Sequence, residues 1–165
     1  MDNHILALKL ILEHLGIEPS IETVDQRKAV QKAIYLAQRA GLDMGYRFSW
    51  YLMGPYCSSL AKDYYSLADA KDSDPMYHNQ DATLIDSAKQ VLNQIKPVLQ
   101  KPAEFTLSDS DWLELVASWN YLIHVSGKSE QEALETIKFE KPRLAEFVEL
   151  AKQKLRANRT PAISA

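Results

Sequence analysis

The side chains best suited to chemistry gather in one stretch, YRFSWYLMGPYCSSLAKDYY, which spans residues 46–65 and holds the only cysteine of the chain, Cys57. A cysteine nucleophile needs a base close in space, most often a histidine. The stretch GPYCSSL has no cysteine-hydrolase signature, and none of the four histidines lies in a recognisable partner motif. These are His4, His14, His78 and His124. We therefore interpret Cys57 as a packed thiol and predict no enzymatic activity.

Metal and cofactor sites are equally poorly supported by the sequence. One cysteine and scattered histidines give no zinc spacing. The acidic runs DSDP and SDSD lack the glycine and the final glutamate of a calcium loop, and SDSD reads better as a helix start. The five glycines lie singly, so no phosphate-binding loop is formed. We expect neither a metal ion nor a cofactor.

The aromatic stretch has two faces if it forms a strand, because successive side chains of a strand alternate. One face is expected to be core: Tyr46, Phe48, Trp50 and Leu52. Tyr51 and Met53 belong to the other face, and Tyr56 follows the Gly54-Pro55 turn. Tyrosine and methionine are common anchors of protein interfaces. Partner binding by Tyr51, Met53 and Tyr56 is one hypothesis; ordinary packing is the other.

Basic residues gather on the helix before this stretch, with one more inside it, and suggest contact with nucleic-acid phosphates. They are Arg27, Lys28, Lys32, Arg39 and Arg47. The alternative is an ordinary solvated helix surface, offset by the nearby Glu22 and Asp25. The net charge of −3 and the pI of about 5.8 argue against a broad nucleic-acid-binding surface.

The elements that must position these residues are almost all helical. Apolar periodicity predicts helices over about 5–15, 23–40, 58–70, 84–96, 108–126, 129–138 and 142–155, with a strand, or half of a hairpin, at 46–52. Capping boxes are predicted at Thr23, Ser108 and Ser129. Residues 71–82 are polar and turn-rich, and we expect a mobile loop there.

The predicted fold class is therefore all-α or mainly α, with a single multi-helix domain over 1–157. Residues 1–70 form the motif-bearing half, residues 83–157 a helical layer packed on it, and residues 158–165 a frayed tail. No signal peptide and no apolar run of about 20 residues is present, so we expect a cytoplasmic protein with no membrane partner.

The motif residues resemble those of a family of small bacterial and archaeal proteins, called here YwgA-like. The pattern is Lys-x-x-Tyr-Leu-x-Gln-x-x-Gly, followed by Tyr-x-Phe-x-Trp-Tyr-x-x-Gly-Pro-Tyr-Ser-x-x-Leu-x-x-Asp. Its residues here are Lys32, Tyr35, Leu36, Gln38, Gly41, Tyr46, Phe48, Trp50, Tyr51, Gly54, Pro55, Tyr56, Leu60 and Asp63. Cys57 departs from the pattern, which has serine there. The later runs LELVASWNYLIH and EALETIKFEKPRL extend the likeness over most of the chain.

More distantly, the arrangement is similar to the Panacea domain of SocA-type antitoxins. That resemblance implies a winged-helix-like N-terminal half and a protein-binding role beside toxins, phage functions or antiphage defence genes. It makes Tyr56 and Asp63 further candidates for partner contact. Two function hypotheses stay open: an antitoxin-like or adaptor module that binds a toxin or defence effector, and a winged-helix-like DNA-binding regulator.

Overall fold

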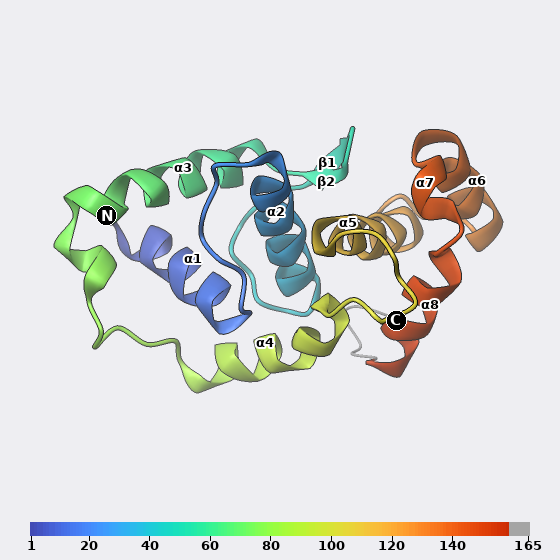
Figure 1. Cartoon of the computed structure of the whole chain (residues 1–165). Helices are drawn as coiled ribbons and strands as arrows, with labels where there is room; N and C mark the ends of the chain where they lie inside the picture. Colours follow the sequence, from blue (N-terminus) through green and yellow to red (C-terminus); the bar gives the residue numbers. More distant parts are fainter. Residues whose placement is uncertain (159–165) are drawn as a thin grey trace.

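The computed structural model describes residues 1–158, which form a mainly helical molecule with one short hairpin (Figure 1). The fold class predicted from the sequence is thereby confirmed. The α-helices are α1 (Asn3–His14), α2 (Val24–Arg39), α3 (Ser58–Ser73), α4 (Asp86–Leu99), α5 (Asp109–Asn120), α6 (Glu130–Glu140), α7 (Pro142–Ala145) and α8 (Val148–Ala157). The strands are β1 (Ser49–Tyr51) and β2 (Gly54–Tyr56), which pair antiparallel with Trp50 opposite Pro55.

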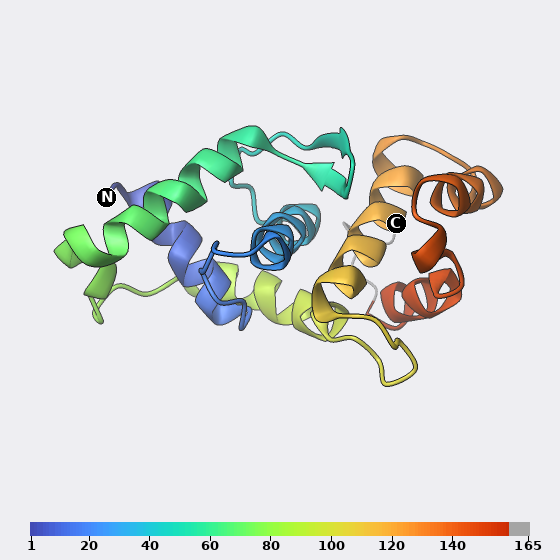
Figure 2. The ribbon, with the colours of Figure 1, turned by 45° about the horizontal axis from the view of Figure 1, so that its top comes forward.

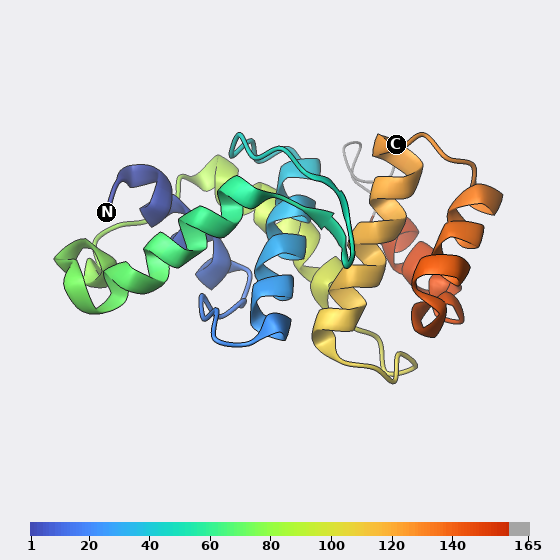
Figure 3. The same cartoon turned by 90° about the horizontal axis from the view of Figure 1, so that it is seen from above.

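Helices α2 and α5 pack against each other at the centre of an elongated molecule. Helices α1 and α3 lie on the far side of α2, whereas α6, α7 and α8 lie beyond α5 (Figure 2). Seen from above, the hairpin reaches from the top of α2 across to α5 (Figure 3). One continuous apolar core runs through all of these helices, from Ile5 on α1 to Leu155 on α8.

The helix starts follow the capping signals of the sequence. Thr23 and Ser129 each form a full capping box, with Gln26 and Glu132 respectively, as predicted. Ser108 accepts a hydrogen bond from the backbone N–H of Asp111, so it caps α5. The Asp111 carboxylate does not complete the box, because it turns inward to meet Lys28 and Arg143.

The two central helices are buried on nearly every side. Helix α5 is buried without a break from Ser110 to Asn120, and α2 is buried from Val30 to Ala37. The alternative of an ordinary solvated helix surface is therefore wrong for Lys28 and Lys32, which are both buried. Helix α2 is covered by α5 on one side and by α1 and α3 on the other, so its polar face meets protein.

The aromatic stretch forms a hairpin, as one reading of the sequence allowed, but its strands are displaced. Gly54-Pro55 does not break the strand; it begins β2. Tyr46 is buried and Phe48 and Trp50 pack partly against the core, whereas Leu52 is 80% exposed. Assigning Leu52 to the core was wrong because the chain turns at that residue instead of continuing as a strand.

Three other element boundaries differ from those predicted from the sequence. Helix α3 extends to Ser73, and a 3₁₀ turn follows at Pro75–His78, so much of the expected loop 71–82 is ordered structure. Helix α4 continues past Pro97 to Leu99. The predicted helix 142–155 is two helices, separated at residues 146–147.

Three further expectations concern the N-terminal half, the C-terminal tail and membrane-spanning segments. The winged-helix-like arrangement of residues 1–70 is not confirmed. The predicted tail lies outside the described residues from residue 159 onward. Within residues 1–158, no helix has both the length and the apolar character that crossing a bilayer requires.

Candidate functional site

The turn of the hairpin presents apolar side chains to solvent. Tyr51 is 59% exposed, Leu52 80% and Met53 41%. Val24 and Tyr65 are also large, apolar and at least half exposed, and they line the same pocket as Tyr51 and Met53. We call these five residues the hairpin patch. Large exposed apolar side chains are ordinary when scattered, but a group of them on one surface marks an interaction site.

Polar side chains of α2 hold the segment that carries this patch. The Gln38 amide donates to the Tyr46 carbonyl and accepts from the Tyr46 N–H, both at 2.9 Å. The Gln31 amide makes the same pair of 2.9 Å bonds with Cys57. Between them, Lys32 Nζ donates to the Pro55 carbonyl at 2.7 Å. Helix α2 therefore fixes the backbone of the segment at its start, Tyr46, and near its end, at Pro55 and Cys57.

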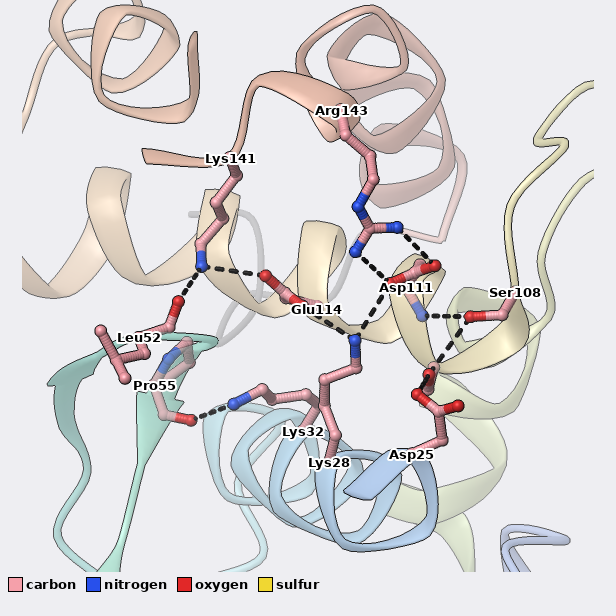
Figure 4. Close-up of polar contacts among 11 residues, drawn as sticks. Asp25, Lys28, Lys32, Leu52, Pro55, Ser108, Asp111, Glu114, Lys141 and Arg143 are labelled. Carbon is pink, nitrogen blue, oxygen red and sulfur yellow. Dashed lines mark hydrogen bonds and ion pairs between the residues drawn. The ribbon is translucent and has the colours of Figure 1, made fainter. Parts of the chain in front are cut away.

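A second lysine fixes the turn from the opposite side. Lys141, between α6 and α7, donates from Nζ to the Leu52 carbonyl at 2.9 Å and to Glu114 Oε2 at 2.9 Å (Figure 4). Its ammonium group also lies 5.3 Å from the centre of the Trp50 ring. One buried lysine thus binds a carbonyl of the exposed turn, at Leu52, and the other binds a carbonyl of strand β2 just after it, at Pro55.

Lys141 belongs to an ionic network built on α5, and Lys32 lies beside it. Glu114 accepts from Lys28 at 2.9 Å as well as from Lys141 (Figure 4). Asp111 accepts from Lys28 at 3.0 Å and binds the Arg143 guanidinium through two 2.8 Å hydrogen bonds. This network joins α2, α5 and the α6–α7 junction beneath the hairpin.

The pKa values follow from these contacts. Hydrogen bonds from Arg143, and then from Lys28, hold the pKa of Asp111 well below its usual range. Burial alone would raise the pKa of Glu114, but Lys141 and Lys28 outweigh it and lower that pKa. Burial lowers the pKa of Lys32 to about 7, and Lys141 and Lys28 add to the effect against the opposing attraction of Glu114.

A pocket of about 250 Å³ opens between the hairpin, α2 and α3. Its walls are largely aromatic: Tyr51, Tyr56, Tyr64 and Tyr65, together with Met53 and Val24. The remaining lining comes from three basic residues of α2, Arg27, Lys28 and Lys32. The pocket therefore brings together three residues singled out for partner binding (Tyr51, Met53 and Tyr56) and three singled out for phosphate contact.

The hairpin lies against α5 without room for a side chain at Gly54. This residue has φ +92°, and a Cβ built there would collide with Ser118 Oγ. Both the backbone conformation and the close approach therefore require glycine. Beyond it, the Trp50 ring packs on Tyr121, 5.7 Å between centroids, where α5 widens into a π-helical turn (Tyr121–Val125).

The other predicted site residues lie elsewhere. Asp63 accepts a 2.6 Å hydrogen bond from the Tyr46 hydroxyl and lies 3.3 Å from His4 Nε2, so it binds the start of α1 and is not part of the pocket. Arg47 is exposed and Arg39 is partly buried, and neither lines the pocket. The basic set is thus not one exposed face: Lys28 and Lys32 are buried and engaged within the protein.

Cys57 is buried at the start of α3, with its sulfur 3.1 Å from Ser59 Oγ. It is the N-cap residue of α3 and makes no side-chain capping hydrogen bond, and its backbone N–H donates to the Gln31 amide oxygen. Among residues 1–158, no group of three or more His, Cys, Asp or Glu side chains is placed to hold a metal ion.

Sequence reasoning missed the ionic network that joins Lys28 and Lys141 to α5. The sequence places Asp111 in a helix start and does not single out Glu114, Lys141 or Arg143. A charged residue within an apolar helical run, such as Glu114 in WLELV, is the only local signal available, and it does not name its partner. The contacts span 83 and 86 residues for Lys28 and 27 residues for Lys141, so no local pattern reveals them.

Comparison with known proteins returns no matching family model, no similar curated protein and no similar solved structure. The function proposed below therefore rests on the geometry of the hairpin patch, the pocket and the network.

Proposed function

We propose that this chain is a non-enzymatic protein-interaction module that binds its partner through the hairpin patch. The observation that carries the proposal is the exposed apolar turn Tyr51-Leu52-Met53, whose neighbouring carbonyls are held by the buried amines of Lys32 and Lys141. Burying two lysines is unfavourable unless their hydrogen bonds and ion pairs offset the lost hydration. Here those bonds fix an apolar surface that the fold itself does not bury.

A rigid apolar turn is suited to binding. Partner association is weakened by the ordering of loops and side chains, and a surface already fixed in its bound conformation avoids that loss. Tyrosine and methionine also supply large contact area. The walls of the pocket add a concave feature beside the protruding turn.

The resemblance to SocA-type antitoxins supports the finer proposal that the partner is a toxin or a defence effector of a bacterial cell. DNA binding is the weaker alternative. Two of the five basic residues on which it depended, Lys28 and Lys32, are buried, and helix α2 has too little free surface to enter a major groove.

The test is affinity capture from the cells that encode the chain, with the captured proteins quantified by mass spectrometry. The bait variants are the triple change Tyr51→Ser, Leu52→Ser and Met53→Ser, and the matched control Ile85→Ser. Ile85 is 72% exposed and immediately precedes α4, a helix that lies on the opposite side of the molecule from the hairpin (Figure 1). We expect one protein bound equally by wild type and control, and about tenfold less by the triple variant.

Recovery of no specific protein, or equal recovery with the triple variant, would contradict the proposal. The captured protein is then expressed alone and together with the chain. A toxin or effector arrests growth when alone and not when the chain is present; growth unaffected in both cases would remove the antitoxin-like role and leave the adaptor role.

A further inference from the structure

The pocket beneath the hairpin is lined by cations and by no carboxylate. Arg27, Lys28 and Lys32 contribute to its lining, and the other lining residues are aromatic or apolar. The acidic members of the network, Asp111 and Glu114, lie behind Lys28 and do not reach the pocket. The pocket is thus complementary to a negative charge carried on an apolar or flexible stem.

Lys32 lies beside the network, and within residues 1–158 it forms no ion pair with a carboxylate. Lys28 binds both acids, Lys141 binds Glu114 and Arg143 binds Asp111. Lys32 is 2% exposed, and the contact found for its ammonium group is the neutral carbonyl of Pro55. Lys28, Lys141 and Arg143 are thus each paired with a carboxylate, whereas the ammonium group of Lys32 has no ion pair within residues 1–158.

The size of the pocket limits what can enter. Its volume of about 250 Å³ is below the roughly 300–1,000 Å³ typical of small-molecule sites. It corresponds to about eight water molecules at roughly 30 Å³ each, which is room for one side chain. The apolar turn beside the pocket would contact the residues that flank such a side chain.

We propose that the pocket receives the carboxylate of an aspartate or glutamate from a partner polypeptide, with Lys32 as its counter-ion and the tyrosines around its stem. This inference rests on the proposed function, because the acidic residue belongs to the partner that the hairpin patch binds. The lowered pKa of Lys32 agrees with it: a buried ammonium group with no carboxylate in direct contact is partly deprotonated at neutral pH, and an entering carboxylate restores its charge.

The test is selection of short random peptides displayed on phage against the folded protein. We expect enrichment of peptides with an acidic residue flanked by apolar ones. The acidic preference is lost with Lys32→Met and kept with the control Lys62→Met, which changes an exposed lysine of α3. The triple hairpin variant used above loses binding altogether. Circular dichroism confirms that each variant is folded.

A selected peptide then provides a measurement on the wild-type protein alone, which holds even if Lys32→Met fails to fold. Replacing its acidic residue with the amide is expected to weaken binding about tenfold. Binding of the acidic peptide should weaken between about pH 7 and pH 9 as Lys32 loses its proton, while binding of the amide peptide stays constant. The charged groups facing Lys32 are Glu114, Lys141 and Lys28, and the pocket tyrosines ordinarily titrate near 10.

The outcomes separate the two proposals. Enrichment of apolar peptides without an acid would overturn the role of Lys32 and leave the protein-binding proposal standing. No enrichment of any peptide would count against both. If a single-stranded oligonucleotide binds instead, and Lys32→Met abolishes that binding, the pocket takes a phosphate and the acidic side chain is the wrong ligand.

Discussion

At the scale of single residues, the unusual feature of the molecule is a set of charged side chains buried in its interior. Lys28, Lys32, Glu114 and Lys141 are all buried, and three of them form ion pairs with one another. A buried ion pair adds little net stability compared with apolar packing, yet it imposes a single geometry on the groups that it connects. Here that geometry includes the backbone of the hairpin turn.

The first prediction concerns Glu114, which neutralises two lysines. Glu114→Gln leaves the Lys28 and Lys141 ammonium groups without this carboxylate, so we expect the free energy of unfolding to fall by about 3–5 kcal/mol. The matched control is Glu13→Gln, which removes a partly exposed i,i+4 pair with Lys9 and should change stability by less than about 1 kcal/mol. Urea unfolding measures both. Equal losses of unfolding free energy in the two variants would show that the buried network stabilises the fold no more than a partly exposed ion pair does.

The second prediction concerns Lys32 and pH. Its pKa is about 7 in the folded protein and near 10.5 in the unfolded chain, so the unfolded state binds the extra proton between these values. Stability should therefore rise from about pH 7 to about pH 9, by up to about 1.4 kcal/mol per pH unit. Urea unfolding at several pH values follows this rise in wild type and in Lys62→Met. Lys32→Met should lose it; an unchanged slope in that variant would assign the effect to another group.

At the scale of elements, helix α2 acts as the support of the hairpin. Its side chains Gln31, Lys32 and Gln38 bind the segment from Tyr46 to Cys57 at successive points. The Tyr35 hydroxyl donates to Asn120 at 2.7 Å and ties the same helix to α5. Most of the motif residues that resemble a known pattern therefore have structural roles here, and the exposed residues Tyr51, Leu52 and Met53 are the ones left for binding.

The third prediction tests the contact between hairpin and α5. Gly54→Ala forces a residue with φ +92° to carry a Cβ that collides with Ser118. We therefore expect the free energy of unfolding to fall by roughly 2–4 kcal/mol. Gly127→Ala, with φ +68° and open space around it, should lose only about 1 kcal/mol. Thermal unfolding compares them.

The double variant Gly54→Ala with Ser118→Ala provides the internal check. Removing the hydroxyl relieves the collision and leaves the backbone strain, so part of the lost stability should return. Absence of any recovery would place the hairpin farther from α5 than the structure does.

The elements themselves were largely predictable from local signals. Capping residues such as Thr23 and Ser129 set helix starts through neighbours three residues away, and apolar spacing marks the helices. The depth of burial was not predictable in this way. Whether Lys28 faces water or α5 depends on what packs against α2, and those residues lie more than 80 positions along the chain.

The candidate site was predicted only in part, because local patterns reveal residue types and turns but not long-range packing. Tyr51, Met53 and Tyr56 were found because aromatic residues near a turn are visible in sequence, and they do line one pocket. Leu52 was misplaced because strict alternation assumes that the strand continues through the turn. Asp63 was misplaced because helix α3 directs it toward Tyr46 and His4.

At the scale of the whole molecule, the hairpin lies where the two groups of helices meet. Helices α2 and α3 lie on one side of it, and α5 and the α6–α7 junction on the other. Lys32 and Lys141 connect the hairpin to each group. A partner bound at the hairpin patch would therefore contact a surface whose shape depends on the packing of both groups.

The most direct measurement of partner binding is photo-crosslinking at single positions in the cells that encode the chain. A benzophenone amino acid replaces Leu52, which is 80% exposed in the hairpin patch, or Ile85, which is 72% exposed before α4. We expect a discrete crosslinked protein from position 52 and none from position 85. The same crosslinked species from both positions, or none from position 52, would contradict binding through the hairpin.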